Sequence, residues 1–176
     1  PANCIAKWDR SNWNALGEGV NNWVNVLAMS GSDLYVGGDF TGAGGVSANY
    51  IARWKDGSWS GLGEGLNDHA YSLAFGPDGA LYVGGWVTLS GGSGAGRVAK
   101  WKDGSWSSLG NGVNSDVYAL LFADGGALYV GGSFSQAGNG GARFLAKWDG
   151  ASWSAIGSGA RGGWPSVNTI VAAADA

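Results

Sequence analysis

The sequence contains very few of the side chains that bind transition metals or form disulfides. It has one cysteine, Cys4, and one histidine, His69, so an internal disulfide is impossible and metal sites built on clusters of these residues are excluded. Charged residues make up only 13% of the chain, and no apolar run is long enough to cross a bilayer. We therefore expect a soluble folded domain without a metal, a cofactor or a membrane-inserted segment.

The charge balance disfavours nucleic acid as a partner. The chain has 10 basic and 13 acidic residues and a formal net charge of −3, which excludes a grip on phosphates based on bulk positive charge. The chain also begins at Pro1, without a methionine or a charged-then-apolar leader. We expect a processed, excised or engineered piece from which any targeting segment has been removed.

Glycine and tryptophan are abundant instead, with 35 and 11 residues, and both follow a repeat. An apolar-Ala-basic-Trp segment recurs at intervals of 46, 47 and 47 residues, and each of its tryptophans is followed five residues later by a second one. These pairs are Trp8 and Trp13, Trp54 and Trp59, Trp101 and Trp106, and Trp148 and Trp153. A second motif, Leu-Tyr-Val-Gly-Gly, begins at Leu34, Leu81 and Leu128. Self-similarity at this period indicates a repeat architecture.

Each unit reads as four short strands, because apolar, β-branched and aromatic runs alternate with clusters of Gly, Asp, Asn and Ser. In the second unit we predict strands A to D at about 71–75, 81–85, 97–101 and 106–110, and no segment has helical periodicity. The predicted class is all-β. The chain divides into a C–D hairpin at 5–17, repeats at about 24–63, 70–110 and 117–157, and a closing strand at about 167–172, which is 15 strands in total. The glycine-rich segments 41–49, 88–96 and 135–143 are predicted to be flexible B–C connections.

The turn between strands C and D fixes their register. Asp56-Gly57 and Asp103-Gly104 suit a two-residue type I′ turn, and Gly150-Ala151 suits type II′. In the first hairpin Arg10-Ser11 occupies this place, so that loop is predicted to be either longer or strained.

This register predicts the two faces of each hairpin. Trp54 lies opposite Trp59 on one face, and Ile51 lies opposite Leu62 on the other. A sheet with two apolar faces must be covered on both sides, as it is in the stacked four-stranded blades of a β-propeller. We therefore expect all eight paired tryptophans to be buried between blades. The basic residue before each first tryptophan is expected to pack its aliphatic stem on the aliphatic face while its charged head reaches solvent or a neighbouring acid. A row of phosphate or sialic-acid contacts is the alternative.

The strand ending in Gly-Gly, the glycine-rich loop, Trp54 and Trp59 together resemble the Kelch-type β-propeller repeat. Similar repeats occur in bacterial and fungal surface or secreted proteins, so the resemblance implies an extracellular or cell-surface location. It also implies a module that binds proteins or glycans, although the fold alone does not fix function. A copper-radical oxidase on this fold needs more than one histidine ligand, and this chain has only His69.

Fifteen strands are one short of four complete blades. Three arrangements fit this count: a four-bladed ring with one defective blade, a half-ring that pairs with a copy of itself, or a fragment of a longer ring. Because a half-ring would leave open strand edges and an apolar blade face, we expect self-association or a longer parent chain.

Candidate ligand-binding residues lie where the repeats differ. Just before strand A the successive repeats carry Trp23, His69, Asp116 and Ser166, and a position packed identically in each blade should not vary so widely. Trp86 replaces a small polar residue, and Trp164 lies in a lengthened loop. The predicted ligand-binding residues at one mouth of the propeller are Asn22, Trp23, Asp68, His69, Trp86, Asp116 and Trp164.

Three functions follow from these observations, in order of preference. The first is a non-catalytic recognition module, with a carbohydrate preferred over a protein ligand. The second is a structural scaffold that assembles with copies of itself. An enzyme ranks third, because no pair of nucleophile and base is visible in the sequence.

Overall fold

The computed structural model describes residues 2–123, 125–160 and 165–172, and its regular structure is entirely β. Three four-stranded antiparallel sheets follow one another along the chain, which confirms the predicted propeller blades. The first blade consists of β3 (Val24–Ser30), β4 (Asp33–Gly38), β7 (Ile51–Lys55) and β8 (Ser58–Gly61). The second consists of β9 (Ala70–Phe75), β10 (Leu81–Gly85), β13 (Val98–Lys102) and β14 (Ser105–Ser108). The third consists of β15 (Val117–Phe122), β16 (Leu128–Gly132), β19 (Leu145–Trp148) and β20 (Trp153–Ala155).

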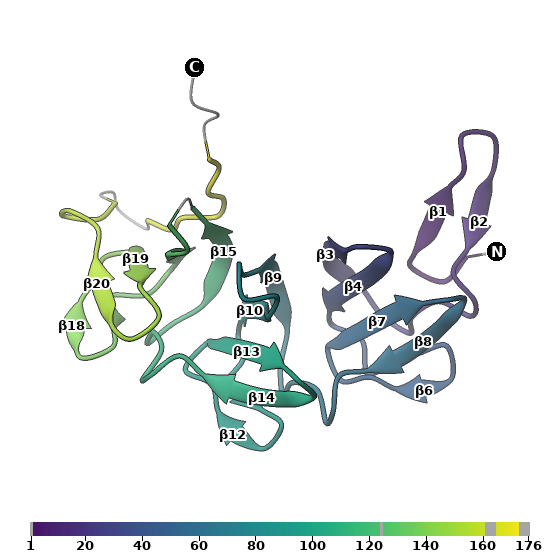
Figure 1. The fold of residues 1–176 in the computed structure, drawn as a ribbon, viewed down its shortest axis with the longest axis horizontal. Helices are drawn as coiled ribbons and strands as arrows, with labels where there is room; N and C mark the ends of the chain where they lie inside the picture. Colours follow the sequence, from purple (N-terminus) through teal and green to yellow (C-terminus); the bar gives the residue numbers. More distant parts are fainter. Residues whose placement is uncertain (1, 124, 161–164, 173–176) are drawn as a thin grey trace.

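The blades are arranged as an open arc (Figure 1). The first strands of the blades, β3, β9 and β15, lie side by side along its inner edge, and the later strands fan outward. A separate N-terminal hairpin of β1 (Ala6–Trp8) and β2 (Trp13–Ala15) stands at one end of the arc, and β19 and β20 stand at the other. The described residues thus form three complete blades and the outer half of another.

The hairpin register is the predicted one in all four units. Trp54 pairs with Trp59, and the Asp56-Gly57 turn has φ values of +48° and +81°, as a type I′ turn requires. The pairing of β7 with β8 ends at Ala52 and Gly61, one pair before the predicted pair of Ile51 and Leu62. Both of these side chains are nevertheless buried in the same hydrophobic cluster.

The first hairpin keeps the two-residue loop, and that loop is strained. This is one of the two alternatives predicted from the sequence. Arg10 has φ of +83°, a left-handed conformation that costs a residue with a Cβ about 1–2 kcal/mol. The carboxylate of Asp9 holds the turn, since its Oδ1 accepts the backbone N–H groups of Asn12 at 2.7 Å and Ser11 at 2.9 Å. These two bonds and the side chain of Asn14 lower the pKa of Asp9.

The predicted strand count was wrong, because each glycine-rich B–C connection forms a small hairpin of its own. Two-residue strands pair within each connection, so the described residues contain 20 strands. The pairs are β5 (Gly42–Ala43) with β6 (Val46–Ser47), β11 (Leu89–Ser90) with β12 (Ser93–Gly94), and β17 (Gln136–Ala137) with β18 (Gly140–Gly141). The connections are therefore ordered by backbone pairing and by an asparagine that precedes each blade.

This asparagine caps the small hairpin in every blade. In the second blade Asn67 Oδ1 accepts the N–H groups of Thr88 at 3.0 Å and Leu89 at 2.8 Å, and its Nδ2 donates to Thr88 Oγ1 at 2.8 Å. Asn21 and Asn114 make the corresponding bonds in the first and third blades.

Asn67→Ala is expected to lower the free energy of unfolding by about 1–2 kcal/mol, because two backbone N–H groups lose their acceptor. Asn67→Asp keeps an acceptor oxygen and is expected to cost less. Urea unfolding of both variants measures the difference, and equal losses would contradict the capping role of the side-chain oxygen.

The closing strand predicted at 167–172 is not a strand in the structure. The segment nevertheless takes the inner-strand position, since the backbone N–H of Val167 donates to the carbonyl of Gly132 at 3.1 Å. Val167 also lies against Gly131, as Val117 lies against Gly84 in the preceding blade. Within the described residues this segment has no strand B of its own blade to pair with, which explains why it forms no ladder.

The tryptophan pairs join neighbouring blades, as predicted, in three of the four units. The second tryptophan of each blade donates its indole N–H to a carbonyl at the end of the preceding unit. The bonds are Trp59 to Leu16 at 2.7 Å, Trp106 to Leu62 at 2.9 Å and Trp153 to Leu109 at 2.7 Å. The expectation of burial holds fully only for Trp59, at 8% exposed, because the other five tryptophans of these three pairs are half-buried. It was wrong for Trp8 and Trp13, which are 49% and 72% exposed. No described unit precedes the N-terminal hairpin, so nothing covers this pair.

Two of the four basic residues before the first tryptophans, Arg53 and Lys100, lie against acids. Lys100 Nζ lies 2.7 Å from Asp78 Oδ2 and 5.5 Å from the centre of the Tyr82 ring. Its pKa is raised mainly by the hydrogen bond to Asp78. Arg53 lies 3.9 Å from Asp33 in the first blade. These contacts favour the packing role over a row of anion contacts.

Candidate functional site

The variable residue before each inner strand is held by the second glycine of the Leu-Tyr-Val-Gly-Gly motif. In the second blade the backbone of Gly85 lies so close to His69 that a Cβ would overlap the His69 carbonyl oxygen. The next backbone N–H, that of Trp86, donates to the same carbonyl at 3.0 Å. Gly38 and Gly132 hold the carbonyls of Trp23 and Asp116 in the same way. The Gly-Gly motif, which is the same in all three repeats, thus fixes the backbone of a residue that differs between them.

A β-bulge next to each of these contacts turns one more side chain toward the same place. The pairing of β9 with β10 passes from Ser72–Gly84 to Ala70–Gly85 and leaves Tyr71 without a partner. The same shift leaves Asn25 unpaired in β3 and Tyr118 unpaired in β15. Bulges commonly redirect a side chain next to a functional site. Here they bring the three bulged residues next to the variable ones.

His69 is the centre of the resulting group and bridges two blades. Its Nδ1 lies 2.9 Å from Oδ1 of Asp39, which follows β4 in the first blade. The same carboxylate oxygen accepts a hydrogen bond from Nδ2 of Asn25 at 2.7 Å. The imidazole Nε2 lies 3.4 Å from Asp68 Oδ1, which also accepts the His69 backbone N–H at 2.8 Å. Both ring nitrogens therefore face carboxylates.

Aromatic rings surround the imidazole. Trp86 and Tyr71 stack on it with centroids at 6.4 and 6.1 Å, and Tyr50 meets it edge-on at 5.6 Å. Burial, together with the negative charges of Asp39 and other nearby carboxylates, raises the pKa of Tyr71. Its phenol therefore keeps its proton at neutral pH and can donate a hydrogen bond.

Arg97 connects this group to the third blade. Its guanidinium Nη1 donates to the carbonyl of Trp86 at 2.8 Å and lies 3.6 Å from Asp116 Oδ1. The other carboxylate oxygen of Asp116 accepts the hydroxyl of Tyr118 at 3.2 Å. Arg97 has φ of +68°, and a left-handed residue stands at the same repeat position in each unit, as Cys4, Tyr50, Arg97 and Phe144. Such strained backbone is frequent at binding sites.

We name this set the inner-loop cluster. It comprises Asn25, Asp39, Tyr50, Asp68, His69, Tyr71, Trp86, Arg97, Asp116 and Tyr118. Four predicted site residues lie in it, namely Asp68, His69, Trp86 and Asp116. Of the others, Asn22 donates to the carbonyl of Asp39 at 3.3 Å, so it lies at the border of the cluster.

The last two predicted residues are Trp23 and Trp164. Trp23 is 72% exposed, although its carbonyl accepts the Asp39 N–H at 2.9 Å and thus anchors it beside the cluster. Trp164 lies outside the described residues.

Sequence reasoning missed the six other members of the cluster, which are Asn25, Asp39, Tyr50, Tyr71, Arg97 and Tyr118. Tyr50 and Arg97 occupy one repeat position that varies from Cys to Tyr, Arg and Phe, so the variability that identified His69 could have identified them too. Tyr71 gave no such signal, because its orientation depends on the bulge.

The cluster can offer hydrogen bonds and aromatic faces to a ligand. Trp86 is 46% exposed, and the three carboxylates supply acceptors. Within the described residues no group of three His, Cys, Asp or Glu side chains could hold a metal ion.

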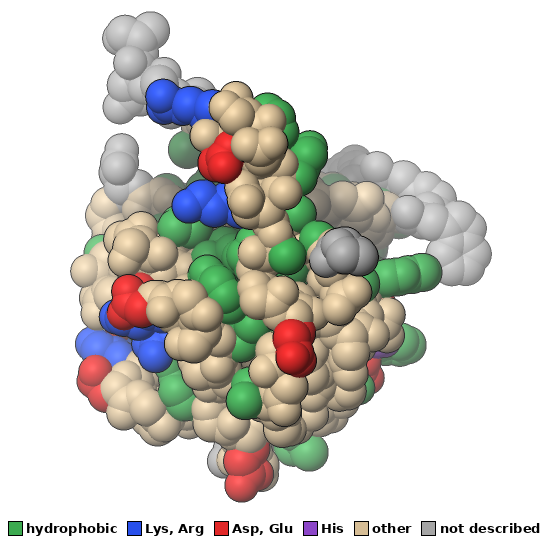
Figure 2. Space-filling model, turned by 90° about the vertical axis from the view of Figure 1, so that its right-hand side faces the viewer, with side chains coloured by type: hydrophobic (Ala, Val, Ile, Leu, Met, Phe, Trp, Pro, Cys, Tyr) green, Lys and Arg blue, Asp and Glu red, His purple; other side chains and the backbone are tan. Residues whose placement is uncertain are grey.

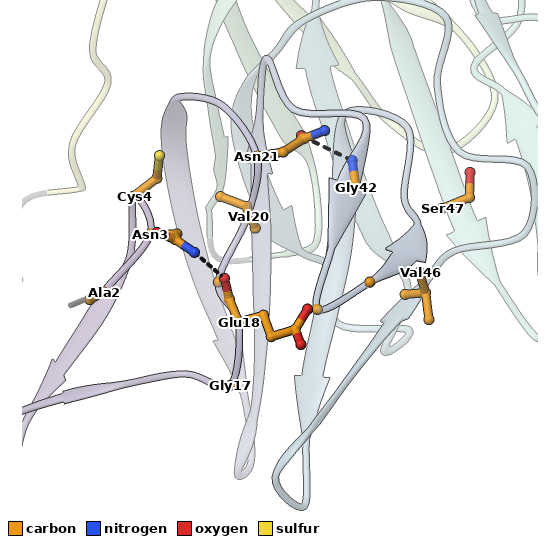
Figure 3. A pocket seen from close by; sticks show the side chains of 13 residues that line it. Ala2, Asn3, Cys4, Gly17, Glu18, Val20, Asn21, Gly42, Val46 and Ser47 are labelled. Carbon is orange, nitrogen blue, oxygen red and sulfur yellow. Dashed lines mark hydrogen bonds between the residues drawn. The ribbon is translucent and has the colours of Figure 1, made fainter.

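A groove lies at the N-terminal end of the arc, apart from the inner-loop cluster (Figure 3). This groove of about 960 Å³ runs between residues 2–4, the loop 17–21 and the β5–β6 hairpin. It is lined mainly by glycine and small side chains, with Glu18 as its one charged residue. Ala2 is exposed here, whereas its repeat counterparts Ala48, Ala95 and Ala142 are at most 2% exposed. The groove therefore belongs to the open end of the arc and lacks the convergent polar groups of the inner-loop cluster.

Comparison with known proteins gives one match. A family model described as the Rax2 C-terminal beta propeller domain matches residues 6–170. No curated protein and no solved structure matches the chain. In the described part of the chain no helix has the length and apolar character needed to span a membrane.

Proposed function

Because the chain belongs to the family of the Rax2 C-terminal beta propeller domain, we propose that it is a non-catalytic recognition module with the inner-loop cluster as its ligand surface. A propeller domain suggests a binding or scaffold module, and the proposal goes further by naming the surface and the ligand. The observation that carries it is the convergence on His69 of repeat-variable residues from two blades, which Arg97 links to Asp116 of the third. An extracellular or cell-surface location and a Kelch-like relationship of the Gly-Gly and Trp motifs are part of the same proposal.

The chemistry of the cluster favours a neutral carbohydrate over an anionic ligand. The half-exposed indole of Trp86 offers an apolar face on which a sugar ring can stack. Asp68 and Asp116 offer acceptors for sugar hydroxyls, and both side chains are partly exposed. Arg97 is already engaged by the Trp86 carbonyl and Asp116, so little free positive charge is left for an acid.

A glycan array followed by tryptophan-fluorescence titration tests this proposal. The chain is expected to bind a neutral oligosaccharide, and Trp86→Ala is expected to weaken that binding at least tenfold because the stacking face is lost. Trp86→Phe retains a ring and should lose less. Trp13→Ala is the matched control, since it removes an exposed tryptophan from the N-terminal hairpin and should leave sugar affinity unchanged.

Absence of binding to any neutral sugar would overturn the carbohydrate proposal. Equal affinity of the wild type and Trp86→Ala would place the ligand elsewhere. The second candidate function, a scaffold, is favoured by a separate observation, the two uncovered ends of the arc.

A further inference from the structure

The interface between successive units is built three times from the same parts. An indole N–H of one unit donates to the carbonyl of the residue that directly follows the last strand of the unit before it, as described for Trp59 and Leu16. The first tryptophan of the pair packs on the glycine that follows this carbonyl. An added Cβ would lie 3.1 Å from the Trp54 ring at Gly17, 3.2 Å from Trp101 at Gly63 and 3.5 Å from Trp148 at Gly110. Each interface therefore has a tryptophan half and a carbonyl-glycine half.

The N-terminal end of the arc presents an unused tryptophan half. Trp8 and Trp13 are already paired, with ring centroids 5.4 Å apart at an interplanar angle of 50°. The three pairs that lie between units have centroids 5.0–5.3 Å apart at 50–57°. The aliphatic face of this hairpin, Ile5 and Leu16, is packed into the first blade, so the indoles face outward. Figure 2 looks onto this end and shows hydrophobic side chains gathered around the protruding hairpin.

The opposite end presents the matching carbonyl-glycine half. Ile156 occupies the repeat position of Leu16, Leu62 and Leu109, and among the described residues its carbonyl accepts only the N–H of Gly159. At Gly157 no atom of the described chain lies within 4 Å of where a Cβ would stand. A groove of about 480 Å³ borders this position between β17–β18 and β20.

The aliphatic face at this end is also incompletely covered. Leu145 and Ile156 are half-buried, whereas Ile51 and Leu62 at the same repeat positions are 0% and 3% exposed. The two ends of the arc are thus the two halves of one interface, and they lie at opposite ends of the molecule (Figure 1).

We propose that these ends bind each other between two copies of this chain. Trp13 of one copy donates its indole N–H to the Ile156 carbonyl of the second, and Trp8 packs over Gly157 of that second copy. The occupant is a second copy because the chain's own tryptophan pair already has the geometry of the three pairs between units. It therefore fits an acceptor that the chain itself builds three times elsewhere. A head-to-tail contact of this kind either closes a ring of copies or continues as a filament.

Sedimentation velocity at chain concentrations from about 1 to 500 µM tests the proposal. We expect the chain to assemble increasingly as its concentration rises. Two variants block one end each. Trp13→Ala removes the indole, and Gly157→Asn fills the acceptor with a residue that tolerates the φ of +55° at that position. Each variant alone is expected to weaken self-association at least tenfold. Leu89→Ser removes an exposed apolar side chain far from both ends and is expected to assemble like the wild type.

Mixing the two blocked variants is the decisive step. Gly157→Asn retains an intact tryptophan half and Trp13→Ala an intact acceptor half, so the mixture is expected to form one-to-one heterodimers. Circular dichroism verifies that both variants are folded. The proposal would be overturned if the wild type remained monomeric at every concentration tested. This holds both for an arc that stays open and for one whose own two ends meet. So would a mixture that remains monomeric. A failure to bind sugar leaves this inference unaffected, because it uses no residue of the inner-loop cluster.

Discussion

Trp59→Ala is expected to lower the free energy of unfolding by about 3–5 kcal/mol, the usual cost of removing a large buried aromatic side chain. The indole is 8% exposed, donates to the Leu16 carbonyl at 2.7 Å and lies against Gly44 of its own blade. The substitution removes packing on both sides and leaves that carbonyl with one bond fewer.

Trp13→Ala is the matched control for this prediction, since Trp13 holds the same repeat position but is 72% exposed. At low micromolar concentration its expected cost is below about 1 kcal/mol, as for most surface substitutions. Urea unfolding of both variants measures the contrast. Equal losses would show that tryptophans at this position contribute through the hairpin itself rather than through the contact between units.

Gly85→Ala is expected to cost about 3 kcal/mol or more, because its Cβ would overlap the backbone carbonyl of His69, and a backbone group cannot move aside as a flexible side chain can. The clash falls at the bulge that orients Tyr71, so the inner-loop cluster should be disturbed together with the fold. The tertiary contact therefore makes this glycine both a packing residue and a positioning residue for His69.

Gly141→Ala is the control, because a Cβ there meets no described atom within 4 Å and the residue does not have a left-handed φ. Its expected effect on unfolding is within about 0.5 kcal/mol. Thermal unfolding compares stability, and one-dimensional proton NMR of the imidazole signals reports whether His69 keeps its surroundings. An unchanged His69 environment in Gly85→Ala would show that the glycine does not position the cluster.

The two proposals use different parts of the molecule. The inner-loop cluster relies on residues that vary from repeat to repeat, whereas the end-to-end contact relies on residues that the repeats share. This division has a physical basis, because a contact repeated at every blade must keep its geometry, while a loop residue such as His69 can change without loss of the fold.

The sequence by itself determined the local architecture of this protein. A two-residue turn such as Asp56-Gly57 sets the strand register, so the pairing of Trp54 with Trp59 follows from spacing and the alternation of side chains alone. The repeat period then determined the four-stranded units and the all-β class. These features depend on residues close together in the chain, and they were predictable for that reason.

Only the tertiary structure decided what those units bury and what they bring together. Trp13 and Trp59 have the same motif around them, yet one is exposed and the other is buried, because burial depends on whether another unit lies alongside. The approach of Asp39 to His69 joins different blades, and the orientation of Tyr71 depends on the bulge opposite Gly84 and Gly85. Contacts between distant segments depend on the relative placement of whole sheets, which local spacing does not specify.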